Sequence, residues 1–206
     1  MARPRKYDDE ALLESLRATF LELGPAASSQ ELAKRAGVSE GTLFKRFGTK
    51  RKLFVQAMRM PALEDQVWME SMPARVGKGS LESQVADLTL AFMGYISEII
   101  PIMQTVMSSG KMKPRDLRAV IGDEDAPPEL VRDRFEVYFR GEIEAGRMRP
   151  LDTRTLADFL LGACLKHVHL LQYFGDLPGS ETLEQASRRF ARAVVELAGA
   201  RPITSS

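Results

Sequence analysis

The stretch SSQELAKRAGVSEGTLFKRFGTKRK, which starts at Ser28, constrains the fold more than any other part of the chain. Ser28 and Glu31 have the S-x-x-E spacing of a capping box, which predicts that a helix begins here. Gly37 follows the last turn of that helix, where a left-handed residue ends a helix at low cost. Ser39 then caps a second helix over 40–47. Two short helices joined by so tight a turn predict a helix-turn-helix.

The second helix of this motif has an apolar and a polar side. Leu43 and Phe47 are four residues apart and share the side that turns inward. The opposite side carries a glycine, which allows a close approach, together with a hydroxyl group and two cations. These groups can bind the phosphates and the base edges of a DNA major groove. These outward residues are Gly41, Thr42, Lys45 and Arg46.

A basic run follows the motif. Thr49 is placed to cap a third helix, and Lys50 opens the run KRK in its first turn, where the helix dipole favours negative charge. A phosphate bound at this turn explains the cations; the alternative is a solvated charge run. The helix is expected to continue toward the body of the chain, with a kink or break at Pro61. A ligand in the body that moved the far end of this helix would then tilt the DNA-binding part.

Residues 1–23 complete the head. Arg3, Arg5 and Lys6 form a basic arm that can lie along phosphates or in a minor groove; without DNA, a disordered tail is an equal alternative. A helix over 7–23, capped by Asp8, carries an apolar stripe that is expected to pack on the helix-turn-helix.

Residues 19–58 resemble the DNA-binding domain of the tetracycline-repressor (TetR) family. The matching pieces are Phe20–Gly24, Ala36-Gly37-Val38-Ser39, Gly41-Thr42-Leu43 and Phe47-Gly48-x-Lys50. Two departures are present: the link after Gly24 is one residue short and carries Pro25 where an aromatic is common, and 44–46 stand where the family often has two aromatics and a histidine, which affects the base sequence that is read.

The resemblance implies a DNA-binding domain over 1–52 and a ligand-binding and dimerisation domain over 53–206. It also implies double-stranded operator DNA as a partner. The expected DNA-contacting residues are Arg3, Arg5, Lys6, Ser28, Ser39, Gly41, Thr42, Phe44, Lys45, Arg46, Thr49 and Lys50.

Charge and cysteine content narrow the class of protein. The first sixty residues carry a net charge of +5 and the remainder −4, against +1 for all 206 residues, so only the head is expected to meet nucleic acid. Cys164 is the single cysteine, which excludes an internal disulfide and a cysteine cluster for zinc. No apolar run reaches the roughly 20 residues of a membrane span and no signal peptide is recognised, so a cytoplasmic protein with no membrane partner is expected.

The rest of the chain is patterned for helices, and the expected fold class is all-α, with about nine helices. The predicted body helices cover 81–100, 102–107, 129–145, 153–175 and 180–198, with a loop over 73–80. Pro101 is expected to break the first of these helices. The last two carry more apolar surface than one body covers, and the resemblance implies that they form a four-helix homodimer interface, which a charge at Leu160 or Phe190 should disrupt.

Enzymatic chemistry has no positive support. His167 and His169 are two residues apart, so on a helix they point in different directions and do not share a metal. No nucleophile elbow, phosphate loop or dinucleotide fingerprint occurs. We therefore expect no enzyme activity, no cofactor and no metal.

Ten methionines are many for this length. Ordinary core packing is one interpretation; an adaptable pocket for a small apolar or aromatic effector is the other. The expected lining is Trp68, Phe92, Met103, Met107, Tyr138 and His167.

Together these features predict a TetR-like transcriptional regulator, a repressor that binds a palindromic operator as a dimer and is released by the effector. The alternatives are a helix-turn-helix DNA-binding protein without a small-molecule ligand, and an enzyme or structural helical protein whose head matches by accident.

Overall fold

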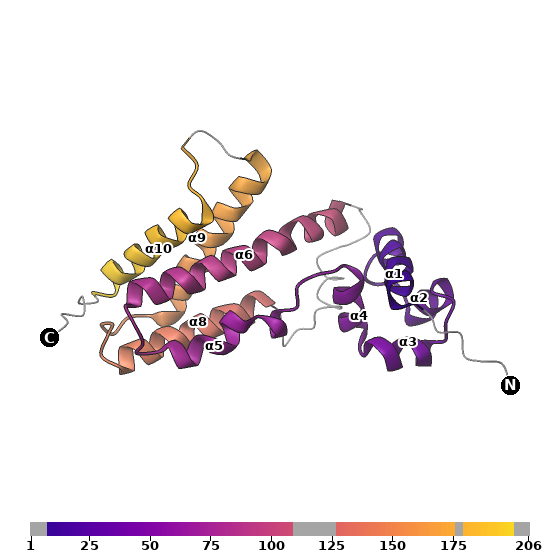
Figure 1. Ribbon diagram of the computed structural model, residues 1–206, viewed down its shortest axis with the longest axis horizontal. Coiled ribbons are helices and arrows are strands. Elements are labelled where there is room, and N and C mark those ends of the chain that lie inside the picture. The colour runs from indigo at the N-terminus through magenta and orange to yellow at the C-terminus, as the bar shows by residue number, and fades with distance from the viewer. Residues whose placement is uncertain (1–7, 109–126, 176–178, 200–206) are drawn as a thin grey trace. The chain divides into compact units, whose positions relative to one another are not determined.

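The computed structural model describes residues 8–108, 127–175 and 179–199. Within them the chain forms nine α-helices and one 3-10 turn, with no strand, which confirms the all-α prediction (Figure 1). The chain divides into two compact units. We call the unit of Met1–Ala62 with Pro101–Ala126 the head, and the unit of Leu63–Ile100 with Pro127–Ser206 the body.

The head contains the first four helices. They are α1 (Asp9–Leu23), α2 (Ser29–Arg35), α3 (Glu40–Phe47) and α4 (Lys50–Ala57). Their apolar stripes meet in one core, in which the rings of Phe20 and Phe54 pack edge to face at 5.1 Å between centroids. Val106, far along the chain, is buried in the same core. The predicted domain boundary at residue 52 stays a prediction, because compactness alone does not define the DNA-binding part.

Helix α4 is shorter than the sequence suggested. α4 ends at Ala57, before Pro61, and the next residues close it with the backbone bonds of a Schellman motif: Arg59 N donates to Gln56 O and Met60 N to Val55 O. Arg59 takes a left-handed φ of 53°. Met60 precedes a proline and is disfavoured in helical geometry, so the helix stops inside the head. It is therefore not a continuous rod into the body.

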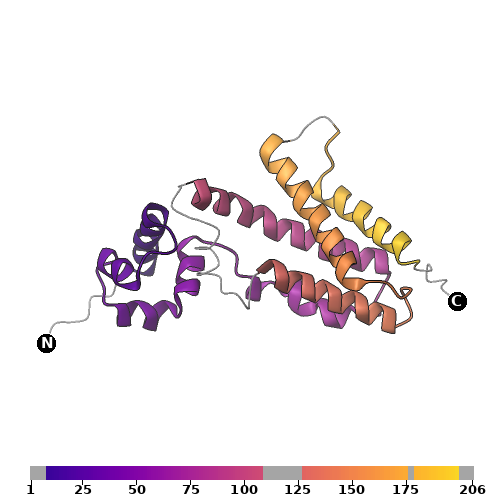
Figure 2. The ribbon, with the colours of Figure 1, turned by 180° about the vertical axis from the view of Figure 1, so that it is seen from behind.

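The body is a bundle of α5 (Val67–Arg75), α6 (Leu81–Ser108), α8 (Pro127–Glu144), α9 (Thr153–Phe174) and α10 (Leu183–Leu197), with the 3-10 turn Leu63–Asp65 before it. α8 packs along α5 and α9, and α10 packs on α9; both views of the ribbon show this (Figures 1 and 2). Aromatic rings fill the core, with Trp68 6.2 Å from Phe92 and 6.4 Å from Phe135 between centroids.

Three sequence expectations about the body are wrong. α6 continues through Pro101 to Ser108 as one helix, and α5 includes Pro73. The last helix begins at Leu183, because the capping box is formed by Thr182 and Gln185 and not by Ser180. A proline inside a helix removes one backbone donor and crowds the carbonyl four residues earlier, a cost that tertiary packing offsets here.

α6 is the one described helix that is long and apolar enough to cross a membrane. Its residues Val85, Leu88 and Met93 are buried in the body.

Candidate nucleic-acid interface

Side-chain caps fix the helix-turn-helix. Ser28 Oγ accepts from Glu31 N at 3.1 Å and Ser39 Oγ accepts from Thr42 N at 3.1 Å. Between them Gly37 takes φ 68°, which a side chain would disfavour, and Val38 N donates back to Ala33 O at 3.0 Å. Both predicted helices and their turn are confirmed.

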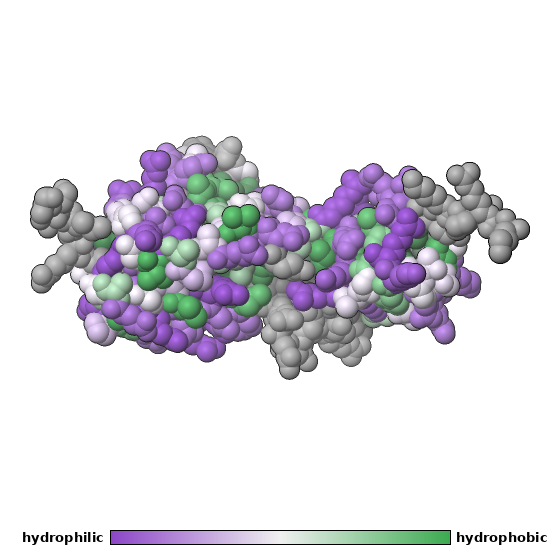
Figure 3. Space-filling model, turned by 60° about the horizontal axis from the view of Figure 1, so that its bottom comes forward, coloured by the Kyte–Doolittle hydropathy of each residue, from purple (hydrophilic) through white to green (hydrophobic). Residues whose placement is uncertain are grey.

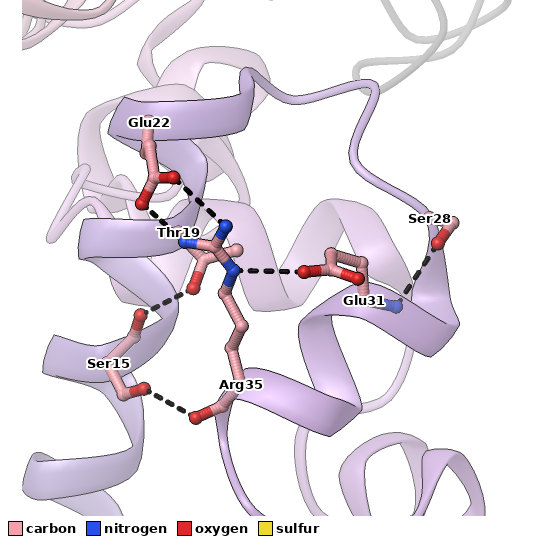
Figure 4. Close-up of polar contacts among 6 residues, drawn as sticks. All are labelled: Ser15, Thr19, Glu22, Ser28, Glu31 and Arg35. Carbon is pink, nitrogen blue, oxygen red and sulfur yellow. Dashed lines mark hydrogen bonds and ion pairs between the residues drawn. The ribbon is translucent and has the colours of Figure 1, made fainter.

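Arg35 fastens α2 to α1 (Figure 4). Its Nη atoms form a fork with the carboxylate of Glu22, with Nη2–Oε1 at 2.9 Å, and its Nε donates to Glu31 at 3.0 Å. These two carboxylates raise the pKa of Arg35, the hydrogen bond from Glu22 contributing most. Glu31 is thus turned toward Arg35. Of the predicted capping box, the Ser28 cap is present, whereas the Glu31 side chain binds Arg35. We call the contacts of Arg35 with Glu22 and Glu31 the Arg35 clamp.

Backbone oxygens take part in further contacts beside the Arg35 clamp. Ser15 Oγ on α1 donates to Arg35 O at 3.2 Å, and Thr19 Oγ1 donates to Ser15 O at 2.8 Å (Figure 4). Thr19 is buried although it is polar. The angle between α1 and α2 is therefore set by polar contacts as well as by the core, and α3 is held through the short turn from α2.

α3 presents the face that the sequence assigned to DNA. Leu43 and Phe47 are buried, whereas Gly41, Thr42 and Lys45 are exposed. Phe44 is half-buried on the flank of the helix. The hydroxyls of Ser39 and Thr42, both exposed, lie 2.8 Å apart.

Arg46, unlike Lys45, is joined to another helix of the head by an ion pair. Its Nε forms an ion pair with Oδ1 of Asp9, at the start of α1. Arg46 is nevertheless exposed, as the sequence predicted. Its partner Asp9 lies 37 positions away, and no pattern in the sequence pairs them.

The start of α4 carries the predicted basic turn. Thr49 Oγ1 accepts from Lys52 N at 3.2 Å, and the first turn contains no acidic residue. Partial burial lowers the pKa of Lys50, a cost that a neighbouring phosphate would offset. Arg3, Arg5 and Lys6 lie outside the described residues.

The six predicted pocket residues fall in two groups. Trp68, Phe92 and Tyr138 belong to the core of the body, and His167 on α9 packs edge to face with Phe190. Met103 packs against the core of the head, and Met107 beside it is 40% exposed. The structure therefore does not bring all six into one compact unit.

Two polar atoms of the body group stand out. Within the described residues His167 Nε2 is buried without a hydrogen-bond partner, whereas the buried Tyr138 Oη lies near the Glu142 carboxylate. Burial raises the pKa of Tyr138, and the negative charge of Glu142 adds to the rise. Buried polar atoms without partners are uncommon and call for an explanation.

Glu142 was missed at the sequence level. It is fully buried, accepts from Gly77 N at 3.3 Å and pairs with Arg147 Nε at 3.0 Å. Its position, seven residues after Phe135, places it on the apolar stripe of α8, which is the signal that could have identified it. No group of three potential metal ligands occurs within the described residues.

The geometry defines a class of protein: a helix-turn-helix head attached to an all-helical body. Residues 12–57 match the family described as "Bacterial regulatory proteins, tetR family". Over these residues the chain accordingly carries a TetR-family domain, in agreement with the resemblance indicated by its motifs.

Solved structures share this fold along most of the chain. A TetR-family transcriptional regulator from Mesorhizobium loti is 18% identical, with 92% of this chain and 95% of that chain covered and a TM-score of 0.61. NalD, the secondary repressor of the MexAB-OprM multidrug efflux pump in Pseudomonas aeruginosa, is 18% identical over 90% and 92%, with a TM-score of 0.53. SmeT, the repressor of the Stenotrophomonas maltophilia multidrug efflux pump SmeDEF, is 16% identical over 98% and 94%, also at 0.53.

Proposed function

We propose that this regulator is a cytoplasmic repressor that binds a palindromic DNA operator as a homodimer and leaves it when a small apolar or aromatic molecule binds the body. DNA binding is supported above all by the exposed face of α3, on which Gly41, Thr42 and Lys45 point outward. Ser39 caps this helix, and Arg35 fixes the preceding helix α2 to α1. Phosphate contacts would come from the start of α4. The proposal assigns no reaction to the chain.

The homodimer is supported by apolar side chains that the single chain leaves in solvent. The exposed ones on α9 and α10 are Phe159, Leu165, Leu170, Tyr173, Phe174 and Leu197. Apolar residues also interrupt the hydrophilic surface elsewhere (Figure 3). Large apolar side chains exposed along neighbouring helices favour a surface that meets another protein. A two-fold dimer would place two α3 helices on successive turns of DNA.

The dimer face differs from the sequence expectation in one respect. Leu160 and Phe190, where a charge was expected to separate the protomers, are 4% and 9% exposed. They belong to the core of the body, so a charge at either position would disturb the fold of the protomer itself. Phe159, which is 70% exposed, is the position that tests the interface.

Binding of an effector is supported by two buried polar atoms, His167 Nε2, which has no hydrogen-bond partner within the described residues, and Tyr138 Oη, which has the Glu142 carboxylate near it. Tyr138 Oη and His167 Nε2 lie on helices whose core neighbours are mostly apolar. A small aromatic molecule with a hydrogen-bonding group would satisfy such atoms. We restrict this proposal to Trp68, Phe92, Tyr138 and His167, since Met103 and Met107 belong to the head unit. The second function considered is DNA binding without any effector.

Repression, as opposed to activation, is supported by the similar folds of NalD and SmeT, which are both described as repressors. By linkage, an effector that weakens DNA binding must itself bind less tightly to the DNA complex by the same factor. A compound whose calorimetric affinity is equal with and without operator is not the effector.

The test of the function is selection of DNA from a random duplex pool by the purified chain. The expected result is enrichment of a palindrome whose half-sites are one DNA turn, or a small multiple of it, apart. Recovery of unrelated sequences with no common motif would contradict the proposal.

A further inference from the structure

A polar hollow of about 440 Å³ lies on the body unit, where α10 begins. Its walls come from α10 and from the residues just before it: Gly179, Ser180, Glu181, Gln185, Arg188 and Arg192. Sites for small molecules commonly have volumes of about 300–1,000 Å³, so the hollow is large enough to hold one. It shares no residue with the proposed effector site or with the exposed apolar side chains of the proposed dimer face.

Two arginines of this wall lie on the outer side of α10. Arg188 and Arg192 are exposed and four residues apart, so they share one side of the helix. Neither forms an ion pair within residues 8–108, 127–175 and 179–199. Arg192 Nε donates to the backbone oxygen of Arg188 at 3.4 Å, and Arg188 affects Glu184, one turn before it, through its charge. Both guanidinium groups therefore have N–H donors left for a ligand.

The carboxylate in the wall of the hollow is already bound by a third arginine. Arg189 Nε donates to the two carboxylate oxygens of Glu181 at 2.9 and 2.8 Å, and its Nη2 donates to Oε2 at 2.5 Å. These hydrogen bonds lower the pKa of Glu181. Arg189 is also held over the ring of Phe190, 4.6 Å from its centroid. Since Arg189 balances the charge of Glu181, the hollow keeps the positive charges of Arg188 and Arg192.

Two neutral side chains add hydrogen-bond donors to the wall. Gln185 Oε1 accepts from Thr182 N at 2.9 Å in the capping box of α10, so the amide nitrogen is the end of Gln185 that is left to donate. Ser180 contributes a hydroxyl group. Two guanidinium groups with two neutral donors exceed what the two oxygens of one carboxylate require. They match the terminal oxygens of a phosphate group, which guanidinium groups bind through paired N–H donors.

We infer that this hollow is a binding site for a small polar molecule that carries a phosphate group. Arg188 and Arg192 bind the phosphate oxygens, Gln185 and Ser180 donate to those that remain, and the rest of the volume holds the organic part of the molecule. The inference goes beyond the proposed function and does not depend on it, because the hollow lies outside the head and outside the apolar effector site.

Isothermal titration calorimetry of the full chain with ribose 5-phosphate, in a buffer free of phosphate and sulfate, tests the inference. We expect the wild type to bind this probe, and Arg188→Gln and Arg192→Gln each to weaken binding about tenfold or more, since each removes charge-assisted hydrogen bonds. Inorganic phosphate should bind more weakly and compete with the probe, and ribose without phosphate should not bind. Arg134→Gln is the matched control, because it removes the same charge from an exposed position of α8 outside the hollow.

Loss of affinity in both α10 variants but not in Arg134→Gln supports the inference. Equal weakening by all three variants overturns it, because the effect would then come from total charge, and so does a wild type that binds neither ribose 5-phosphate nor inorganic phosphate. Succinate binding as tightly as ribose 5-phosphate would overturn the assignment to phosphate. Circular dichroism and sedimentation velocity check that the variants keep the fold and the wild-type mass; a change of mass in both α10 variants would mean that the arginines bind a second copy of the chain, which also overturns the inference. No DNA is present, so failure here leaves the proposed function standing.

Discussion

Gln172 on α9 donates a hydrogen bond from Nε2 to the backbone oxygen of Ser97 on α6 at 2.8 Å. In an uninterrupted helix that oxygen would accept from the backbone nitrogen of residue 101. Residue 101 is a proline and has no N–H to give. A side chain 75 positions away therefore supplies the donor that the sequence of α6 removed, and α6 passes through the proline unbroken.

Replacing Gln172 by Leu should leave the Ser97 oxygen without a partner. We expect the free energy of unfolding to fall by about 1–2 kcal/mol, measured by urea denaturation. In a Pro101→Ala background, residue 101 regains its N–H and can bond to Ser97 itself, so the same Gln172→Leu change should cost much less. An equal loss in both backgrounds would show that the amide acts in some other way.

Gly141 on α8 lies against Val76, in the loop after α5. A Cβ added at Gly141 would be 3.0 Å from Val76 Cγ2 and 3.1 Å from Cγ1. Ala is favoured over Gly inside a helix by about 0.5–1 kcal/mol. We nevertheless expect Gly141→Ala to destabilise the chain, because both Val76 methyl groups would have to give way beside a backbone held by the bond from Gly77 N to Glu142.

The matched test is the same substitution beside Val76→Ala, where both Val76 methyl groups are gone. There Gly141→Ala should become stabilising by up to about 1 kcal/mol. The change of sign between backgrounds, measured by chemical denaturation, is the expected result. Stabilisation in both backgrounds would mean that the contact is not restrictive.

Phe159 and Leu160 are neighbours with opposite environments. Phe159→Asp changes a side chain that is 70% exposed and should yield a folded monomer with a melting temperature close to the wild type. Leu160→Asp places a charge at a position that is 4% exposed and should unfold the body. Sedimentation velocity at micromolar concentration distinguishes these outcomes; a wild-type monomer, or a Phe159→Asp variant that still dimerises, would contradict the proposed interface.

Cys164 gives a pH-dependent prediction. Burial raises the pKa of its thiol from 9.0 to about 12, so the native state keeps a proton that the unfolded state releases. The stability contributed by this group is complete below pH 9 and is lost as pH rises from 9 to about 12, at up to about 1.4 kcal/mol per unit. Cys164→Ala should flatten this alkaline decline in urea denaturation. The native thiol should also resist alkylation at pH 8, and rapid labelling there would contradict its burial.

Lys50 tests the phosphate turn of α4. Lys50→Ala should weaken binding to all duplexes alike and reduce the salt slope by about 1 for each DNA-bound head. Lys45→Ala is the comparison, because it should alter sequence preference as well as affinity. Both are read by anisotropy titrations at several salt concentrations. If Lys50→Ala leaves slope and affinity unchanged, the basic turn is only a solvated charge run.

The sequence by itself determined the local architecture of the head. Ser28, Ser39 and Thr49 cap helices through bonds to residues three positions later, so the pattern that specifies each bond is contiguous in the chain. The inward face of α3 follows from the four-residue spacing of Leu43 and Phe47 for the same reason.

Only the tertiary structure decided where distant groups meet. Gln172 of α9 supplies the donor for the Ser97 oxygen that Pro101 cannot bond, Arg46 is turned toward Asp9, and Val106 at the end of α6 is buried in the core of the head. No periodicity or fixed spacing in the sequence predicts these contacts, because each joins residues that are far apart in the chain and meet only in the folded protein. Helix periodicity predicts which face of a helix is buried, but the partner on that face depends on how the helices pack.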